Sequence, residues 1–246
     1  MLSETSYGKE RNIMAKELSI IARIKSDFPE KFGIPRQSGL ADTHGLIVFE
    51  PEYRTRDAVR GLDGFSHIWL LWEFSESARE NWSPLVHPPR LGGNTRMGVF
   101  ATRSPFRPNP IGLSSVRLNR IEYSPSSGPV LHISGADLKD GTPIYDIKPY
   151  LPYTDSHPDA SGGFADGFTS YRLEVIFPKE LISKLPESQH RAVIQILEQD
   201  PRPSYQNDPE RIYGTAFAGK NIRFRVADNV LTVCNVEDYD EYIRKK

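Results

Sequence analysis

Cysteine is nearly absent from this chain, and its scarcity excludes two kinds of stabilising structure. Among 246 residues there is a single cysteine, Cys234. One thiol forms no disulfide within the chain and no cysteine cage for a metal ion, and it suits a reducing compartment such as the cytoplasm. Residues 230–234 have the composition of a strand, so we expect Cys234 to be a buried strand residue.

Long apolar runs are missing as well. No stretch approaches the roughly 20 apolar residues that a helix needs to cross a bilayer. Residues 1–16 are polar and charged and have no apolar core like that of a secretory signal. We therefore predict a flexible N-terminal extension over residues 1–16.

The sequence also has few signatures of metal or nucleophilic catalysis. The six histidines show neither an HExxH motif nor i, i+4 pairing, so we predict no metal site. There is no GxSxG nucleophile motif and no glycine fingerprint of a Rossmann unit. A metal-dependent phosphohydrolase would need clustered acids, and Asp137, Asp140 and Asp146 are too sparse for that.

Acidic residues and lysine are absent from one long stretch that is rich in arginine. The whole chain has a formal charge of -1, so this excess of positive charge is local. Exposed surfaces generally use both cations, whereas bidentate recognition of a phosphate, a carboxylate or a base edge selects arginine. The alternative is an ordinary surface turn, shaped by its prolines, in which Arg103 and Arg107 are exposed loop residues or partners of acids such as Asp140. The arginines between residues 81 and 121 are Arg90, Arg96, Arg103, Arg107, Arg117 and Arg120.

Alternating apolar residues and β-branched content predict a mainly β fold. No helical pattern of useful length separates the expected strands, which favours an antiparallel β-barrel over a doubly wound sheet. The expected strands are 19–25, 65–74, 97–102, 111–123, 130–134 and 143–148. We assign residues 17–155 to this barrel domain.

The C-terminal part of the chain has a different character. Residues 156–170 are rich in Pro, Asp, Ser and Gly and are predicted to be a linker. Residues 171–246 are predicted to form a small α+β domain with a strand at 171–177. Helices are expected at 178–184 and at 188–199, with Ser188 as the N-cap of the second. A hairpin of strands 221–226 and 230–234 is expected around a turn at 227–229.

Several short motifs, each of which has the composition of an ordinary loop, occur together in a specific order. Pro35-Arg36-Gln37 comes first, residues 98–104 and 107–112 follow, and Asp140-Gly141-Thr142-Pro143 leads into residues 148–153. With the 63–67 and 91–94 segments, this set resembles the TrmO/TsaA family, and residues 199–205 resemble its bacterial branch. The resemblance extends from about residue 19 to the end of the chain.

This resemblance implies methylation of tRNA with S-adenosylmethionine as the cofactor. The expected acceptor is the exocyclic nitrogen of N6-threonylcarbamoyladenosine, beside the anticodon of threonine tRNA. The family implies a β-barrel methyltransferase fold, not a Rossmann one, and a homodimer with the cofactor near the subunit interface. By the same resemblance, the cofactor contacts are Pro35, Arg36, Gln37, His67, Arg103, Leu113, Asp140, Gly141, Thr142 and Pro143.

Several roles stay open at the level of sequence. Leu113 and His67 also fit core positions in their strands, and Trp69 and Trp72 are better explained by core burial than by RNA contact. Asp140, Asp146 and His67 are candidates for a general base, with nothing to choose among them. Arg107 or Arg96 could bind the threonyl carboxylate, and Asn109 is expected to face the RNA with Arg107. The competing hypothesis is a non-catalytic RNA-binding or S-adenosylmethionine-sensing barrel.

Overall fold

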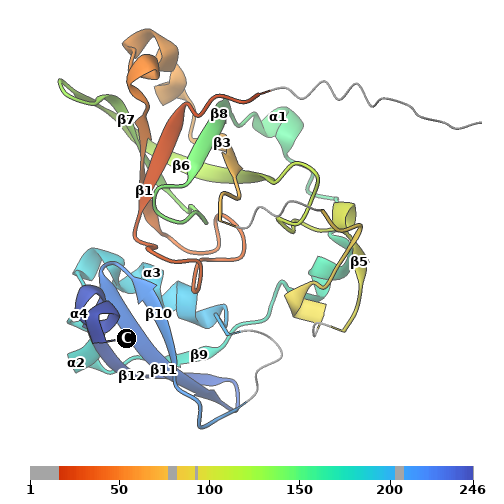
Figure 1. The fold of residues 1–246 in the computed structure, drawn as a ribbon, viewed down its shortest axis with the longest axis vertical. Coiled ribbons are helices and arrows are strands. Elements are labelled where there is room, and N and C mark those ends of the chain that lie inside the picture. The colour runs from red at the N-terminus through yellow and green to blue at the C-terminus, as the bar shows by residue number, and fades with distance from the viewer. Residues whose placement is uncertain (1–16, 77–81, 92–93, 203–207, 246) are drawn as a thin grey trace, which may run out of the picture.

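Six strands close into an antiparallel barrel in the computed structural model, which describes residues 17–76, 82–91, 94–202 and 208–245 (Figure 1). The predicted extension at 1–16 lies outside these residues. The strand order is β1-β2-β7-β6-β3-β8, and the pairing of Ala22 with Ile144 closes the ring. The strands are β1 (Ala22–Ser26), β2 (His44–Phe49), β3 (His67–Glu73), β6 (Ile111–Ser124), β7 (Gly128–Ser134) and β8 (Pro143–Pro149). The predicted antiparallel β-barrel is confirmed.

The barrel core follows from the period-two alternation of its strands. In β3, Ile68, Leu70 and Trp72 point inward and are buried, whereas the residues between them are more exposed. In β6 the inward positions include Ser114 and Val116, both about 1% exposed. Ser114 is therefore a polar residue in a register that otherwise fills the barrel with apolar side chains.

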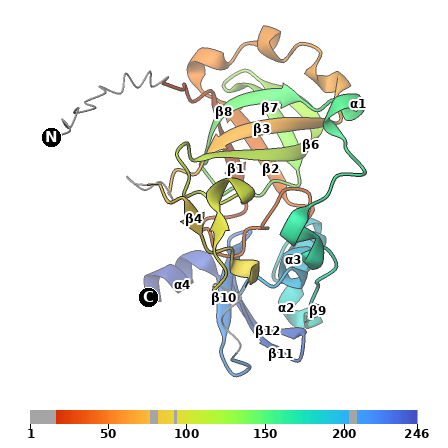
Figure 2. The same ribbon diagram turned by 90° about the vertical axis from the view of Figure 1, so that its right-hand side faces the viewer.

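Short elements cover the two ends of the barrel. The 3₁₀ helices η1 (Pro51–Tyr53), η2 (Arg56–Val59) and η3 (Leu62–Gly64) lie across the end remote from the C-terminal sheet (Figure 2). At the other end an arm carries the two-stranded pair β4 (Leu85–Val86) and β5 (Met97–Gly98). The remaining short elements are η4 (Pro89–Leu91), η5 (Val99–Ala101), α1 (Pro152–Asp155) and η6 (Gly163–Phe168).

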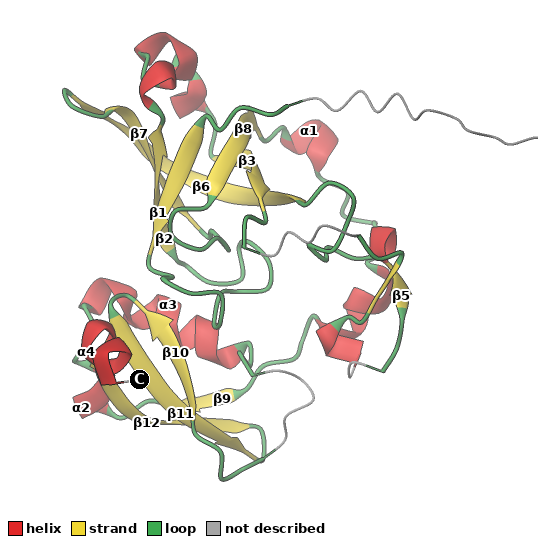
Figure 3. Cartoon of the chain, in the orientation of Figure 1, coloured by secondary structure: helices red, strands yellow, loops and turns green. Residues whose placement is uncertain are grey.

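The C-terminal part forms a four-stranded sheet flanked by helices (Figure 3). Its strand order is β10-β11-β12-β9, and β9 pairs with β12 in the parallel direction. Val193, Ile196 and Leu197 on one face of α3 pack in the core of this sheet. The elements are β9 (Glu174–Ile176), α2 (Lys179–Ile182), α3 (Glu187–Glu198), β10 (Tyr213–Phe217), β11 (Lys220–Ala227), β12 (Val230–Asp238) and α4 (Tyr239–Lys245).

The connection between β1 and β2 joins the barrel to the C-terminal sheet. Phe28 and Ala41 from this connection belong to the hydrophobic core of the C-terminal sheet. The rings of Phe28 and Phe217 lie 5.3 Å apart between centroids. Because the two parts share apolar contacts, we expect them to move together. The predicted boundaries after residues 155 and 170 stay predictions.

Three local predictions were wrong. Residues 97–102 form a strand only at Met97–Gly98, because Thr102 donates from its backbone and side chain to the Val99 carbonyl and so closes the 3₁₀ turn η5. Helix α3 begins after Pro186, so Ser188 is inside the helix and is not its N-cap. Cys234 lies in β12 but is exposed.

The exposure of Cys234 has a local cause. The register between β11 and β12 shifts between Arg223 and Phe224, whose partners are Asn235 and Val233. Leu231 and Val233 point inward, so the period-two alternation points Cys234 outward. Cys234 is also the extra residue of this bulge, which moves the next inward position to Val236. The predicted hairpin turn is confirmed, since Asp228 and Asn229 have φ of 50° and 62°, as a two-residue type I′ turn requires.

Candidate functional site

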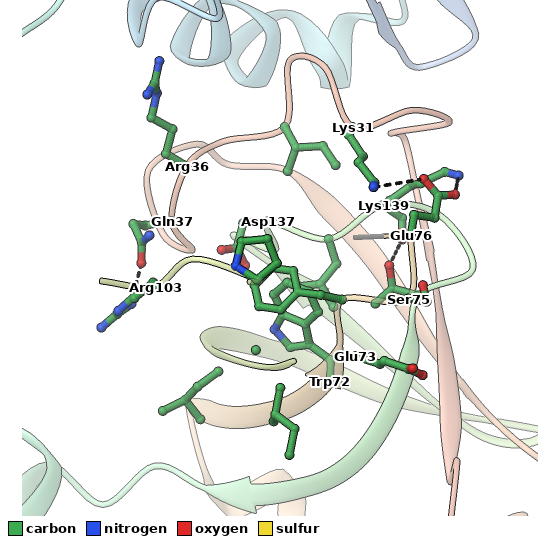
Figure 4. Close-up of a pocket in the computed structure, with 18 of the residues that line it drawn as sticks. Lys31, Arg36, Gln37, Trp72, Glu73, Ser75, Glu76, Arg103, Asp137 and Lys139 are labelled. Atoms are coloured by element: carbon green, nitrogen blue, oxygen red, sulfur yellow. Dashed lines mark hydrogen bonds and ion pairs between the residues drawn. The ribbon is translucent and has the colours of Figure 1, made fainter. Parts of the chain in front are cut away.

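A cavity of about 620 Å³ opens at the end of the barrel that faces the C-terminal sheet (Figure 4). It lies where the β1–β2 connection, the end of β3, the loop before β6 and the loop after β7 converge. This volume is in the range of small-molecule sites, which span roughly 300–1,000 Å³.

Most of the residues predicted for the cofactor and the substrate converge on this cavity. These residues come from three motif regions that are distant in the sequence. Gln37 and Arg103, for example, are more than 60 residues apart, and their side chains are hydrogen-bonded to each other. Pro35 is buried and Leu113 is half exposed, so both offer apolar surface. The predicted site residues that line the cavity are Pro35, Arg36, Gln37, Arg103, Arg107, Asn109, Leu113 and Thr142.

Five predicted site residues do not line this cavity. His67 begins β3 whereas Trp72 is near its other end, so about 16 Å of strand separates His67 from the cavity at roughly 3.3 Å per residue. Arg96 is exposed and lies directly before β5, in the arm that carries β4 and β5. The core interpretation is wrong for both His67 and Leu113, since both are exposed. The other predicted residues outside the lining are Asp140, Gly141 and Pro143.

The Asp140-Gly141-Thr142 segment is a turn, as its composition predicts. Gly141 has φ of +79°, a conformation that favours glycine. Asp140 Oδ1 accepts a hydrogen bond from the backbone of Ser26 at 2.9 Å, and Thr142 Oγ1 donates to the Lys139 carbonyl at 2.8 Å. The Asp140 carboxylate therefore ties the turn to β1, and only Thr142 of the turn reaches the cavity.

Arg103 and Arg107, the two central arginines of the acid-free stretch, make different contacts. The Arg103 side chain is exposed at the cavity and contacts Gln37. Nη1 of Arg107 donates to the carbonyls of Thr102 and Ser104, at 3.2 Å and 3.5 Å, and so braces its own loop. Neither arginine pairs with Asp140 in these contacts, so of the two forms of the ordinary-turn interpretation only the exposed loop residue remains.

Arg36 points away from the cavity centre, toward the C-terminal elements (Figure 4). Its Nη2 donates to the carbonyls of Asp200 and Arg202, at 3.5 Å and 3.4 Å. Burial lowers the pKa of Arg36, and the positive charge of Arg90 lowers it further. Through Arg36, the β1–β2 connection that lines the cavity is attached to the C-terminal part of the chain.

A chain of hydrogen bonds at the barrel mouth was not predicted. The indole nitrogen of Trp72 donates to Ser114 Oγ at 2.9 Å, and the Ser114 hydroxyl donates to Asp137 Oδ1 at 2.6 Å. Burial raises the pKa of Asp137, although the bond from Ser114 and the charge of Arg103 act in the opposite direction. The signal in the sequence was Ser114, a polar residue at an inward strand position. The core interpretation of Trp72 is confirmed.

At the cavity rim, Glu76 holds two lysines. Its carboxylate contacts Nζ of Lys139, and its other oxygen lies 3.7 Å from Nζ of Lys31. These three residues come from the end of β3, the loop after β7 and the β1–β2 connection, which are the segments that form the cavity. Glu76 therefore joins all three across the rim, and its pKa is lowered mainly by the hydrogen bond from Lys139.

The described residues contain no group of three or more His, Cys, Asp or Glu side chains that could hold a metal ion. Within the same residues, no helix is long and apolar enough to span a membrane.

Known proteins match both halves of the chain. The tRNA-methyltransferase O N-terminal domain matches residues 23–156, and the TrmO C-terminal domain matches residues 170–239. A tRNA (adenine(37)-N6)-methyltransferase of Escherichia coli is 43% identical over 217 residues, 85% of this chain and 92% of that protein. One from Eikenella corrodens is 50% identical over 163 residues, 66% of this chain and 91% of that protein.

Solved structures agree with these matches. The crystal structure of TrmO from Pseudomonas aeruginosa superposes with a TM-score of 0.73 at 34% identity, and covers 91% of this chain and 100% of that one. Both the barrel and the C-terminal sheet are thus shared with a solved enzyme of this kind. The chain belongs to the tRNA-methyltransferase O (TrmO) family.

Proposed function

We propose that this protein transfers a methyl group from S-adenosylmethionine to N6 of adenine 37 in tRNA. The proposed acceptor is N6-threonylcarbamoyladenosine in the anticodon loop of threonine tRNA, and the proposed location is the cytoplasm. The observation that carries the proposal is the cavity in which the three motif segments meet. The similar proteins of Escherichia coli and Eikenella corrodens bear the name of the same reaction.

The residues of the cavity fit the chemical groups of S-adenosylmethionine. Pro35, Leu113 and the half-buried Ile34 offer apolar surface for the adenine ring. Arg103 and Gln37 offer donors for the amino-acid carboxylate and the ribose hydroxyls. When bound, S-adenosylmethionine supplies an electrophilic methyl group on a sulfonium. The protein's part is then to hold the acceptor nitrogen in line with that methyl group at attack distance.

The test of this function compares two tRNA substrates. Calorimetry should show binding of S-adenosylmethionine, and methyl transfer should occur on threonine tRNA that carries threonylcarbamoyladenosine at position 37. The same tRNA without the modification should be a much poorer acceptor. Binding of S-adenosylmethionine without any turnover on modified tRNA would instead support the non-catalytic hypothesis.

Arg107 is the proposed partner of the threonyl carboxylate. One of its amino groups braces the loop, and the residue still lines the cavity beside Asn109. We expect Arg107→Ala to reduce the preference for modified over unmodified tRNA by about tenfold or more. A hydrogen bond to a charged group contributes roughly 1.5–3 kcal/mol, and about 1.4 kcal/mol is tenfold. The measurement is kcat/KM on the two tRNAs.

Arg117→Ala is the matched control for this substitution. Arg117 belongs to the same acid-free stretch, is exposed on β6 and does not line the cavity. If Arg117→Ala has any effect, it should lower kcat/KM equally on the modified and the unmodified tRNA. Equal losses on both tRNAs for Arg107→Ala would assign Arg107 to bracing the loop alone. The exposed Arg96 would then be the next candidate for the carboxylate.

We also propose that the protein acts as a homodimer with the cofactor near the interface. The arm before β6 exposes a stacked pair, Trp82 and Phe100, with ring centroids 6.3 Å apart and exposures of 49% and 75%. Exposed apolar surface of this kind is a feature of interfaces and of RNA-stacking sites. His67 and Arg96, exposed away from the cavity, are available to a second copy of the chain.

Sedimentation equilibrium tests the dimer. The wild-type protein should sediment as a dimer and Phe100→Glu as a monomer, because a charge in a buried apolar contact is costly. Tyr153→Glu, at a residue that is 85% exposed in α1, is the control and should remain a dimer. A monomeric wild-type protein would refute the homodimer. If the Phe100→Glu variant remained a dimer, the aromatic pair would be assigned to contact with the tRNA and not to the subunit interface.

A further inference from the structure

Two of the carboxylates that line the cavity have no hydrogen-bonded lysine or arginine among the described contacts. Among the described residues, three acids line the cavity: Glu73, Glu76 and Asp137. Glu76 is occupied by Lys31 and Lys139, and Glu73 accepts a hydrogen bond from the hydroxyl of Tyr145. The described lining contains no histidine. Glu73 and Asp137 each accept a hydrogen bond from a hydroxyl. The charge of Arg103, a proposed cofactor contact, acts on Asp137, so Asp137 is the better placed of the two to exchange a proton with a molecule bound beside the cofactor residues.

The orientation of Asp137 is set by its neighbours. An indole N–H can only donate, so the bond from Trp72 to Ser114 Oγ leaves the Ser114 proton for Asp137. Asp137 Oδ1 accepts that proton at 2.6 Å. Both Trp72 and Ser114 are buried at inward positions of paired strands, so they hold the carboxylate at the mouth of the barrel.

The surroundings of Asp137 also suit a proton acceptor. Burial raises the pKa of its carboxyl, against the lowering effects of Ser114 and Arg103. A carboxylate with a raised pKa is a stronger base than an exposed one, and a base is most effective when its pKa approaches the working pH. The nearby charge of Arg103 nevertheless favours the ionised form that a base must have at the start of a reaction.

The general-base candidates from the sequence are less well placed. His67 is at the far end of β3 and contacts Ser66 and Tyr150. The Asp140 carboxylate accepts from the Ser26 backbone. Asp146 Oδ2 lies 2.8 Å from Nζ of Lys148, and Asp146 does not line the cavity. None of these three candidate bases lines the cavity that holds the proposed cofactor and substrate residues.

We propose that Asp137 is the general base that removes the proton from the exocyclic nitrogen of the acceptor base, with Ser114 and Trp72 as positioning residues. This inference rests on the proposed function. The lone pair of that nitrogen is shared with the purine ring and the carbamoyl group, which makes the neutral nitrogen a poor nucleophile. As its N–H bond breaks, the proton passes to the Asp137 carboxylate and the nitrogen forms a bond to the methyl carbon. The sulfur–methyl bond breaks, and its electron pair stays on sulfur as a thioether.

Asp137→Asn is the first test, because asparagine keeps the shape and can still accept from Ser114 but is not a base. We expect kcat on modified tRNA to fall by about 10²–10⁴-fold. Calorimetric affinities for S-adenosylmethionine and S-adenosylhomocysteine should both be unchanged. In the wild type, kcat should decline as the pH falls through the raised pKa of Asp137, and this limb of the pH profile should be missing from Asp137→Asn.

Two further variants use the pH profile. Ser114→Ala removes a hydrogen bond that lowers the pKa of Asp137, so the ascending limb should move to higher pH. A merely structural role of Ser114 would lower kcat without moving that limb. Asp137→Glu keeps a base at a displaced position, so it should retain the limb with a reduced kcat. These two variants decide the question if Asp137→Asn fails to fold, as judged by circular dichroism.

The possible failures are distinguishable. A wild-type protein without turnover on modified tRNA would refute the proposed function itself. An active wild type with an equally active Asp137→Asn would refute only the general base. Weaker binding of S-adenosylmethionine, but not of the neutral S-adenosylhomocysteine, would show that Asp137 balances the sulfonium charge, and this too would overturn the proposal.

Discussion

Arg202→Ala is expected to lower the free energy of unfolding by about 3–5 kcal/mol, because it leaves a partly buried carboxylate without its partner. Nε and Nη2 of Arg202 donate to the two oxygens of Asp200 at 2.8 Å and 2.9 Å. The two side chains are 10% and 15% exposed, so this pair is far less screened by water than a surface ion pair. Urea denaturation at neutral pH measures the loss.

The same pair predicts how the loss depends on pH. Burial acts to raise the pKa of Asp200, but the hydrogen bonds and charge of Arg202 outweigh it, and the pKa is lowered overall. A carboxyl whose pKa is lowered by folding stabilises the protein above its unfolded pKa, about 3.9, and loses that contribution as the pH falls through the folded value. The difference between wild type and Arg202→Ala should therefore narrow below about pH 4.

The Asp200–Arg202 pair also bears on the cavity, since Arg36 donates to the backbone carbonyls of both residues. We expect Arg202→Ala to weaken S-adenosylmethionine binding as well as stability. The double variant Asp200→Ala/Arg202→Ala is the control, because removing both charges should cost less than the sum of the single losses. Strict additivity, or a loss that does not change with pH, would contradict a coupled ion pair.

Gly112→Ala is expected to lower both stability and turnover. A Cβ atom at Gly112 would lie 2.2 Å from Cε2 and 2.4 Å from Cζ2 of Trp72, its partner across β3 and β6. Forcing an extra carbon into a packed core costs about 1–3 kcal/mol. The displaced indole would also lose its bond to Ser114, which orients Asp137. We therefore expect turnover to fall by about tenfold or more, since about 1.4 kcal/mol is tenfold.

Gly64→Ala is the matched control, since a Cβ atom there would have no neighbour within 4 Å. Thermal denaturation and kcat on modified tRNA should show a large effect at Gly112 and almost none at Gly64. The double variant Gly112→Ala/Trp72→Phe should regain stability, because the smaller ring makes room, but not turnover, because phenylalanine has no N–H. If Gly112→Ala behaved like Gly64→Ala, the close packing of Trp72 would not matter to the site.

Strands with clear alternation could be predicted from the sequence, and strands without it could not. β3 and residues 111–118 of β6 combine buried and more exposed positions with a period of two, so their pattern survives in the sequence. β2, His44–Phe49, was missed because its apolar residues Leu46 to Phe49 are continuous. β10 was missed for a related reason, since its last three residues, Thr215 to Phe217, are all buried and show no alternation. Such short runs do not distinguish a strand from other buried segments.

The chain by itself determined the residue types of the site and their order, because fixed motifs such as Pro35-Arg36-Gln37 and Asp140-Gly141-Thr142 are local. It also determined the barrel, because side-chain alternation is a local property of each strand. Tertiary structure alone decided which of these residues meet. His67 and Trp72 share one strand, but only the closure of the barrel places Trp72 at the cavity and His67 away from it. Ser114 and Asp137 are 23 residues apart, and the pairing of β6 with β7 brings them to 2.6 Å. A proton acceptor made of a buried strand residue and a loop carboxylate depends on that long-range pairing, which no local pattern records.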